Sequence, residues 1–164
     1  STVIQLLKRL NDTKVESIEY EIIVINDGST DSSKELLEKN KNLFTKLIHN
    51  SRNSGKGFSV REGLKVSTGN YIIFQDADLE YDPNEYDKII SPILLNKADV
   101  VFGSRFKGAQ PHRVVYFWHR LGNGFLTLLS NILTDINLTD METCYKAFRT
   151  EILKSIKIKE KRFG

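Results

Sequence analysis

The sequence predicts an α/β fold, a mostly parallel, twisted sheet with helices on both faces. Short apolar, β-branched runs such as YEIIVIN (20–26) and ADVVFGS (98–104) alternate with amphipathic runs such as 2–10. Runs of the first kind are typical of strands buried on both faces, and runs of the second kind are typical of helices that cover a sheet. Their alternation along the chain indicates βα units rather than an all-helical or all-β protein.

In the first half of the chain, a helix is expected over 2–10 and a strand over 20–26. The turn sequence DGSTDSS follows, and Ser32 with Glu35 has the spacing of a capping box for the next helix. The remaining expected elements of this half are a strand over 45–50, a polar loop over 51–57, a helix over about 58–66 and a strand over 71–75.

In the second half, Asp82 followed by Pro83 predicts a helix start, with the helix running to about residue 95. A strand is expected over 98–104, and the aromatic-rich span 112–133 is roughly amphipathic. The last elements are a strand over 144–149 and a helix that Thr150 would cap.

Composition indicates one globular domain spanning residues 1–164. The chain is 40% hydrophobic and 27% charged, and its net charge of +3 is too small to indicate nucleic-acid binding. Cys144 is the only cysteine, which excludes an intramolecular disulfide and fits a reducing compartment. Because no apolar run approaches the roughly 20 residues of a membrane span, we expect a cytoplasmic protein, at most peripheral to a membrane.

Four loops that carry polar and charged residues each follow a predicted strand. They cover residues 26–31, 51–57, 76–80 and 103–105. In open α/β sheets, ligands bind beyond the carboxyl ends of the strands. The sequence therefore predicts that these loops form a single site.

Three acids at alternate positions, Asp76, Asp78 and Glu80, end the strand YIIFQ. Their hard oxygen atoms suit Mg²⁺ or Mn²⁺, which proteins commonly hold through one or two carboxylates while substrate phosphates complete the shell. A solvated acidic loop that caps the next helix would explain the same residues. The spacing alone leaves both interpretations open.

Three further residues have a functional and a structural interpretation. Asp27 at the end of YEIIVIN would accept hydrogen bonds from a nucleotide, or form an Asx turn. The glycines around Lys56 would let the backbone approach a phosphate, although the stretch is not a P-loop. Arg105 would pair with a phosphate through its planar guanidinium, or lie on the surface.

Five ordered blocks resemble the inverting glycosyltransferases of family 2. They are VINDGSTD, SRNSGKGFSVREGL, YIIFQDADLEYDP, DVVFGSRF and RLGNGFLTLLSNILTDINLTDMETCYKAFR. The last block is similar to the branch that makes polyprenyl-phosphate sugars, the dolichyl-phosphate mannose and glucose synthases and their bacterial relatives. The resemblance implies a GT-A fold, a nucleotide-sugar donor such as UDP-glucose or GDP-mannose, and a polyprenyl-phosphate acceptor.

The resemblance also implies a role for each matched residue. Asp27 would contact the base, Asp76-Ala77-Asp78 would form the DxD element, and Asp78 with Glu80 would hold Mg²⁺ or Mn²⁺. Asn53 and Lys56 match the donor-side NxGKG block, and Arg105 matches an arginine near the phosphates. On the acceptor side, the matched residues are Asp140, Lys146 and Arg149.

A polyprenyl phosphate is already anionic, so it needs positive charge to position it more than a base to activate it. Lys146, Arg149 and Arg105 would supply that charge. A hydroxyl acceptor needs a general base, for which Asp140 and Glu142 are the candidates. Transfer to a glycan hydroxyl and a non-catalytic nucleotide-sugar-binding module therefore stay open as alternatives.

The span 112–133 has three possible partners: a membrane interface, given its aromatic residues and the flanking His112, Arg113 and Arg120; the core of the domain; or a second subunit. Family members also begin with a strand of the type V-I-P-x-Y-N-E, which would precede Ser1. We therefore expect the catalytic domain to be truncated at both ends.

Overall fold

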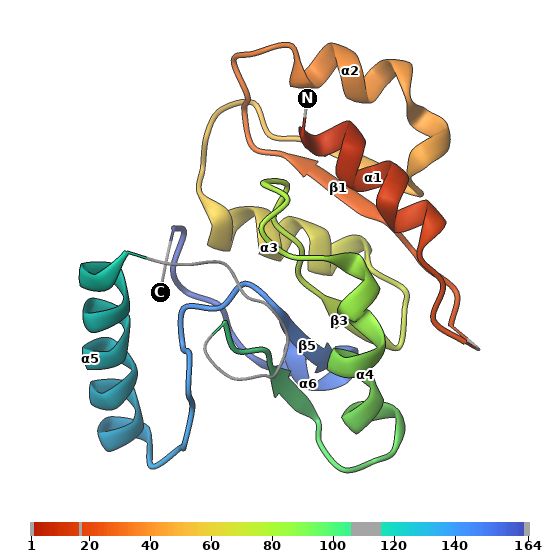
Figure 1. Ribbon diagram of the computed structural model, residues 1–164. Helices are drawn as coiled ribbons and strands as arrows, with labels where there is room; N and C mark the ends of the chain where they lie inside the picture. The colour runs from red at the N-terminus through yellow and green to blue at the C-terminus, as the bar shows by residue number, and fades with distance from the viewer. Residues whose placement is uncertain (1, 17, 106–115, 163–164) are drawn as a thin grey trace.

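The computed structural model describes residues 2–16, 18–105 and 116–162. In the first half, α1 (Thr2–Asp12) leads to β1 (Ile23–Asn26), α2 (Ser33–Lys39), a 3₁₀ turn η1 (Lys41–Leu43) and β2 (Lys46–His49). Helix α3 (Lys56–Val66) and strand β3 (Tyr71–Ile73) complete this half (Figure 1). The predicted alternation is confirmed, with strands shorter than the apolar runs that contain them.

In the second half, η2 (Pro83–Glu85) and α4 (Tyr86–Leu94) precede β4 (Val100–Phe102). The long helix α5 (Phe117–Thr134), strand β5 (Lys146–Arg149) and helix α6 (Thr150–Ser155) follow. His112 and Arg113 lie outside the described residues. No helix in the described ranges has the length and apolar character needed to cross a bilayer.

The described strands form two small sheets, and the mostly parallel arrangement that the sequence suggested is interrupted by one reversed strand. β1 and β2 pair in parallel, whereas β5 lies between β3 and β4 and runs antiparallel to both. The chain leaves β4 at its carboxyl end, passes through α5, and re-enters the sheet from that same end (Figure 1). β5 must therefore run opposite to its neighbours, although β3 and β4 remain parallel to each other.

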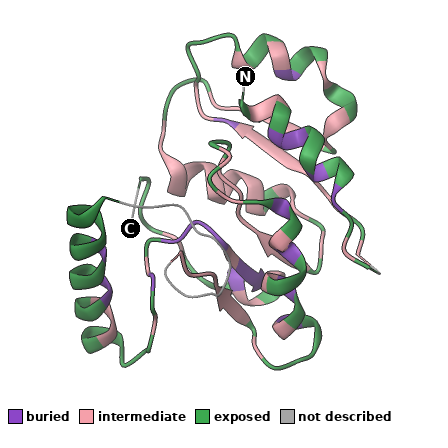
Figure 2. Cartoon of the chain, viewed as in Figure 1, coloured by how far each residue is buried: buried purple, intermediate pink, exposed green. Residues whose placement is uncertain are grey.

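Apolar side chains of α1 and α4 cover the strands. Leu6, Leu7 and Leu10 of α1 are buried in a cluster that includes Leu37 of α2. Ile90 and Ile93 of α4 pack with Ala147 of β5 in a second cluster. Figure 2 shows these buried segments where α1, α4 and β5 lie, whereas α5 is largely exposed.

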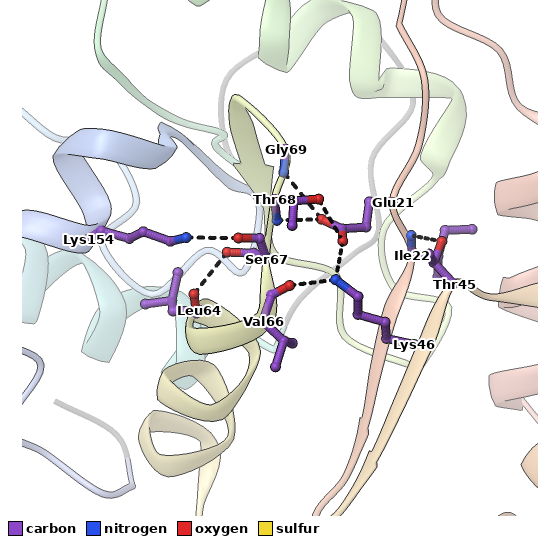
Figure 3. Close-up of polar contacts among 10 residues, drawn as sticks. All are labelled: Glu21, Ile22, Thr45, Lys46, Leu64, Val66, Ser67, Thr68, Gly69 and Lys154. Atoms are coloured by element: carbon purple, nitrogen blue, oxygen red, sulfur yellow. Dashed lines mark hydrogen bonds and ion pairs between the residues drawn. The ribbon is translucent and has the colours of Figure 1, made fainter.

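An ionic clamp joins the edge of the first sheet to the turn between α3 and β3 (Figure 3). The Glu21 carboxylate accepts hydrogen bonds from Lys46 Nζ (2.7 Å), Thr68 N (2.7 Å) and Gly69 N (3.2 Å). Lys46 Nζ also donates to Val66 O at 2.6 Å. Burial alone would raise the pKa of Glu21, but these hydrogen bonds outweigh it and lower the pKa to about 2.

Two of the three predicted helix caps differ from the expectation. Ser32 makes no side-chain capping bond, and Asp31 Oδ1 instead accepts from Ser33 N at 3.0 Å. Thr150 is the first residue of α6 rather than its cap, and its hydroxyl donates to Gly69 O at 2.6 Å. The Asp82 cap is confirmed, since its carboxylate accepts from Asn84 N at 3.0 Å.

Candidate functional site

The predicted site loops meet at one edge of the molecule. The loop after β3 carries Asp76, and the loop after β4 carries Arg105. Because β5 runs antiparallel, it begins where those strands end, and Lys146 pairs with Phe102 at that edge. The structure therefore brings residues from three separate blocks, Asp76, Arg105 and Lys146, to the carboxyl ends of β3 and β4.

Asp27, which follows β1, organises the loop that precedes α3. Its carboxylate accepts hydrogen bonds from Asn50 Nδ2 (2.7 Å), Ser54 N (3.0 Å) and Gly55 N (2.7 Å). Burial alone would raise the pKa of Asp27, but these hydrogen bonds lower it, so the carboxylate is ionised at neutral pH. Gly28 has a φ of 68°, and a Cβ there would lie 2.4 Å from the Arg52 carbonyl carbon. The two loops are thus in direct backbone contact.

The first turn of α3 is fastened to the segment 158–162 through backbone groups. Gly57 N donates to Arg162 O (3.0 Å) and Phe58 N donates to Lys161 O (2.9 Å). A Cβ at Gly57 would lie 2.4 Å from Glu160 O, so only glycine fits there without displacing the segment. The Arg61 guanidinium donates to the carbonyl oxygens of residues 158, 159 and 160. These contacts fix the start of the helix, and with it Lys56.

Lys56 bridges the glycine-containing loop and the acidic loop. Its Nζ lies 2.7 and 2.8 Å from the two carboxylate oxygens of Asp76 and 3.5 Å from Cys144 Sγ. Burial would lower the pKa of Lys56, but the Asp76 carboxylate outweighs it and raises the pKa. Burial raises the pKa of the Cys144 thiol to about 12, which is unfavourable for a nucleophile because the thiolate is the reactive form.

Asp78 and Glu80 lie on an exposed turn beyond Asp76. Asp78 Oδ1 accepts from Glu80 N at 2.9 Å, and Leu79 between them has a φ of 63°. Within the described ranges, no three His, Cys, Asp or Glu side chains are grouped closely enough to hold a metal ion by themselves. Mg²⁺ is commonly held by one or two carboxylates plus substrate phosphates, and the exposed Asp78 and Glu80 carboxylates are oxygen ligands of the type that such an ion prefers.

Arg105 and Asp140 form a bidentate ion pair beside this turn. Arg105 Nε and Nη2 donate to Asp140 Oδ2 (2.8 Å) and Oδ1 (2.9 Å), and Arg105 N donates at 3.1 Å. The Asp140 side chain is 0% exposed, against 25% for Arg105. Burial would raise the pKa of Asp140, but hydrogen bonds from Arg105 and Asn123 lower it. The ion pair and its hydrogen bonds also raise the pKa of Arg105.

A second layer of hydrogen bonds joins this ion pair to α5. Asn123 Nδ2 donates to Asp140 Oδ1 at 2.9 Å, and Thr127 Oγ1 donates to Asn123 Oδ1 at 2.9 Å. Both residues are buried, at 4% and 5% exposure. Sequence reasoning missed them. The signal was a polar residue every fourth position within an otherwise apolar helix.

Lys146 is close enough to Asp76 and Asp140 for both carboxylates to act on its ammonium group. Its Nζ is 4.9 Å from the centre of the Phe102 ring, a cation–π geometry. Burial and the neighbouring Lys56 ammonium lower the pKa of Lys146, while Asp140 and Asp76 partly offset them. Lys56, Lys146 and Arg105 therefore lie near two carboxylates at this edge, those of Asp76 and Asp140.

Arg149 and Asn53 are not brought into this group. Arg149 ends β5, and its guanidinium donates to Asp99 Oδ1 (2.8 Å) and Asn96 Oδ1 (2.6 Å) at the opposite end of the strand. Asn53 is exposed on the loop before α3. A surface hollow of about 520 Å³ lies elsewhere, between α1 and residues 42–45, and its described lining contains none of the predicted site residues.

A family model described as Glycosyl transferase family 2 matches residues 1–157. The chain belongs to glycosyl transferase family 2. Its GT-A-like α/β fold agrees with that assignment, and the predicted resemblance is confirmed at the level of the family.

Individual relatives of this family 2 domain are distant. The chain is 27% identical over 166 residues to an uncharacterised protein of Methanocaldococcus jannaschii, covering 93% of this chain and 69% of that protein. It is 26% identical over 157 residues to a dolichol-phosphate mannosyltransferase of Pyrococcus furiosus, covering 94% of this chain and 44% of that enzyme.

Among solved structures, the domain is similar to S. aureus TarS residues 1–349, with a TM-score of 0.62 and 25% identity. That match covers 94% of this chain and 45% of the TarS chain. A complex of the same TarS fragment with UDP matches with a TM-score of 0.59 and 23% identity, over 93% of this chain and 44% of that chain. The chain therefore spans under half of TarS and of the Pyrococcus enzyme.

Proposed function

We propose that this chain is the catalytic domain of a metal-dependent, inverting glycosyltransferase that moves a hexose from a nucleotide sugar to a polyprenyl phosphate. The observation that carries it is the convergence of Lys56, Lys146 and Arg105 with the Asp76–Glu80 turn at one sheet edge. Donor and acceptor both carry phosphate, so the site must hold two anions close together. Three cationic side chains, at the start of α3, at the start of β5 and on the loop after β4, supply positive charge there.

The donor side of the proposed site comprises Asp27, Lys56 and the turn from Asp76 to Glu80. Asp78 and Glu80 would hold Mg²⁺ or Mn²⁺, which neutralises charge on the leaving nucleoside diphosphate when bound. Lys56 holds Asp76 through both carboxylate oxygens and so fixes the acidic turn against α3. Support for a nucleotide donor comes from the UDP complex of the structurally similar TarS.

The acceptor side comprises Lys146 and Arg105. Asp140 accepts four hydrogen bonds from Arg105 and Asn123, which occupies its lone pairs and keeps it ionised. A carboxylate in that state positions Arg105 and is poorly suited to take a proton from a hydroxyl. This favours an acceptor that is already anionic, as the similarity to a dolichol-phosphate mannosyltransferase also suggests. Arg149 is not included in the proposed acceptor side, because its guanidinium binds Asp99 and Asn96 at the other end of β5.

The test is transfer from labelled UDP-glucose or GDP-mannose to polyprenyl phosphate, with Mg²⁺ or Mn²⁺ and with EDTA. We expect a labelled lipid product that EDTA abolishes. Lys146→Ala should reduce turnover by at least about a hundredfold, the usual scale for an electrostatic contact in the transition state. The exposed Lys157→Ala is the matched control and should leave turnover unchanged.

Two results would contradict the proposal. Labelled product on a glycan hydroxyl, but none on the lipid, would assign a different acceptor. Metal-dependent binding of UDP or GDP by calorimetry, without turnover with either donor, would identify a non-catalytic nucleotide-sugar-binding module.

A further inference from the structure

His49 links helix α2 to the turn that carries Asp27. It is the last residue of β2 and pairs in register with Asn26, the last residue of β1. Its Nδ1 lies 3.1 Å from Asn26 Nδ2, and its Nε2 lies 3.1 Å from Glu38 Oε1 of α2. The ring therefore joins α2 to the end of β1, where a loop of the proposed site begins.

The hydrogen bonds of Asn26 decide which nitrogen of the His49 ring carries the proton. Asn26 is 6% exposed, and its Oδ1 accepts from Ser29 N at 3.0 Å. Since a backbone N–H can only donate, Oδ1 must face Ser29 and the amide must direct its Nδ2–H at His49. His49 Nδ1 is then the acceptor. The one proton of the neutral ring lies on Nε2, where it forms the hydrogen bond to Glu38.

A second proton on His49 removes a hydrogen bond whichever way the amide turns. Nδ1–H would face Asn26 Nδ2–H, which places two donors together with no acceptor between them. Turning the amide over would bring Oδ1 to His49 but would direct Nδ2–H at Ser29 N–H, so the conflict would move into the turn. In both arrangements a buried polar group loses its partner, which costs free energy.

Glu38 acts in the opposite direction. Its carboxylate forms the ion pair that the described residues offer to His49, and it favours the protonated ring. Lys41 of η1 binds the other carboxylate oxygen of Glu38 at 2.7 Å, which reduces that attraction. Asn26, the neighbour on β1, carries no charge. His49 thus has one neighbour that favours each protonation state, and histidine is the side chain that ordinarily changes charge near neutral pH.

The turn from Asn26 to Ser29 carries Asp27, which belongs to the donor side of the proposed site. The carboxylate of Asp27 accepts hydrogen bonds from the loop before α3. The bond from Ser29 N to Asn26 Oδ1 closes the turn across Asp27. The protonation state of His49 is therefore connected, through one buried amide, to the position of the Asp27 carboxylate.

We infer that His49 is a positioning residue for the nucleotide-sugar donor, and that it holds the turn 26–29 in place only as the neutral ring. Protonation removes one of the hydrogen bonds of the Asn26 amide, so the turn loses either its contact with β2 or the bond that closes it. The donor should therefore bind more weakly as the pH falls through the range in which His49 takes up its second proton. The inference deepens the proposed function and rests on it, because it takes the bound molecule to be a nucleotide sugar.

Donor binding is measured by calorimetry with UDP-glucose and GDP-mannose, in the presence of Mn²⁺, at about pH 8 and at about pH 5.5. Both donors are diphosphate diesters, so they lack the terminal phosphate whose second pKa is about 6. The lowered pKa of Asp27 keeps that carboxylate ionised at both pH values. We expect the affinity of the donor that binds to be about tenfold lower at the acidic pH, the scale of one lost hydrogen bond. Equal affinity at both pH values would overturn the inference.

Two histidine variants identify the ring responsible. His49→Gln keeps an amide oxygen for Asn26 but takes up no proton, so the difference between the two pH values should vanish, whatever the affinity at the higher pH. His119→Gln is the matched control, because His119 is exposed on α5, and it should keep the full difference. A difference that His49→Gln retains, or that His119→Gln abolishes, would contradict the role of His49.

The free protein gives a second readout that needs no ligand. Nuclear magnetic resonance records the His49 ring signals and the Ser29 amide signal over the same pH range, and we expect both to change with one midpoint. A Ser29 signal that does not follow the His49 titration would also overturn the inference. If the two signals change together but no donor binds at either pH, the proposed function is contradicted, whereas the link between His49 and the turn is supported.

Discussion

Helices α4 and α5 are both amphipathic, yet they turn opposite kinds of face toward the protein. α4 buries Tyr86, Ile90 and Ile93 against the sheet. α5 buries Asn123 and Thr127 and exposes its leucines and aromatic residues. Helix α4 is thus attached by apolar burial. Helix α5 is attached by hydrogen bonds to Asp140 and to the loop between α5 and Asp140. An amphipathic pattern predicts that a helix has two faces, but it does not say which of them meets the core.

The largest expected effect is on the α4 side of this comparison. Ile93 is 0% exposed, so Ile93→Ala removes buried apolar groups and leaves a cavity. We expect the free energy of unfolding to fall by about 2–5 kcal/mol, measured by equilibrium urea denaturation. A loss below about 1 kcal/mol would mean that α4 is not held by its apolar face.

On the α5 side, the corresponding substitution removes a polar group. Asn123→Leu leaves Asp140 with one hydrogen bond fewer in a buried position, so we expect a loss of about 1–3 kcal/mol in the same denaturation experiment. The exposed Asn137→Leu is the control and should change stability by less than about 0.5 kcal/mol. Stabilisation by Asn123→Leu would show that the attachment of the buried face of α5 does not depend on hydrogen bonding.

Acid should loosen α5 before α4. The folded-state pKa of Asp140 is lowered, so its stabilising contribution is complete above the unfolded value of about 3.9 and is lost as the pH falls through the folded value. The contacts of Ile90 and Ile93 involve no proton. Hydrogen exchange, corrected for intrinsic rates, should show protection in α5 falling below about pH 4 while α4 stays protected. Equal loss in both helices would remove the distinction.

The smallest effect is expected on the exposed face of α5. Leu128 is 58% exposed, so Leu128→Ala in the absence of lipid should change the free energy of unfolding by less than about 0.5 kcal/mol. The comparison with Ile93→Ala is direct, because both substitutions shorten an aliphatic side chain to alanine on an amphipathic helix. A loss comparable to that of Ile93→Ala would place Leu128 in a core.

Local patterns predicted the order of helices and strands, because apolar spacing reports which residues can be buried together. They also predicted that loops at 26–31, 51–57, 76–80 and 103–105 would meet, since loops that follow parallel strands share an edge. Strand direction could not be predicted in this way. The run containing β5 reads like any other buried strand, and only the path of the chain through α5 makes it antiparallel.

The site was predictable in its charged residues but not in their pairing. Family motifs placed Arg149 beside Lys146, but a strand of four residues sends these side chains to different ends, and Arg149 reaches Asp99. The Arg105–Asp140 pair joins residues 35 positions apart, and no local pattern specifies such a contact. The role of Asn123 could not be predicted for the same reason, because it depends on the Asp140 carboxylate, which is close to Asn123 only in the folded chain.

The attachment of residues 158–162 to α3 has a consequence for how this stretch can change. Main-chain carbonyls supply its contacts with Gly57, Phe58 and Arg61, so the identities of the side chains at 158–162 matter little for holding it. An added or deleted residue would shift every carbonyl out of step with its donor. Natural variants should therefore tolerate almost any amino acid at 158–162 but no insertion or deletion there. Gly57 should be substituted far less often than the residues it contacts.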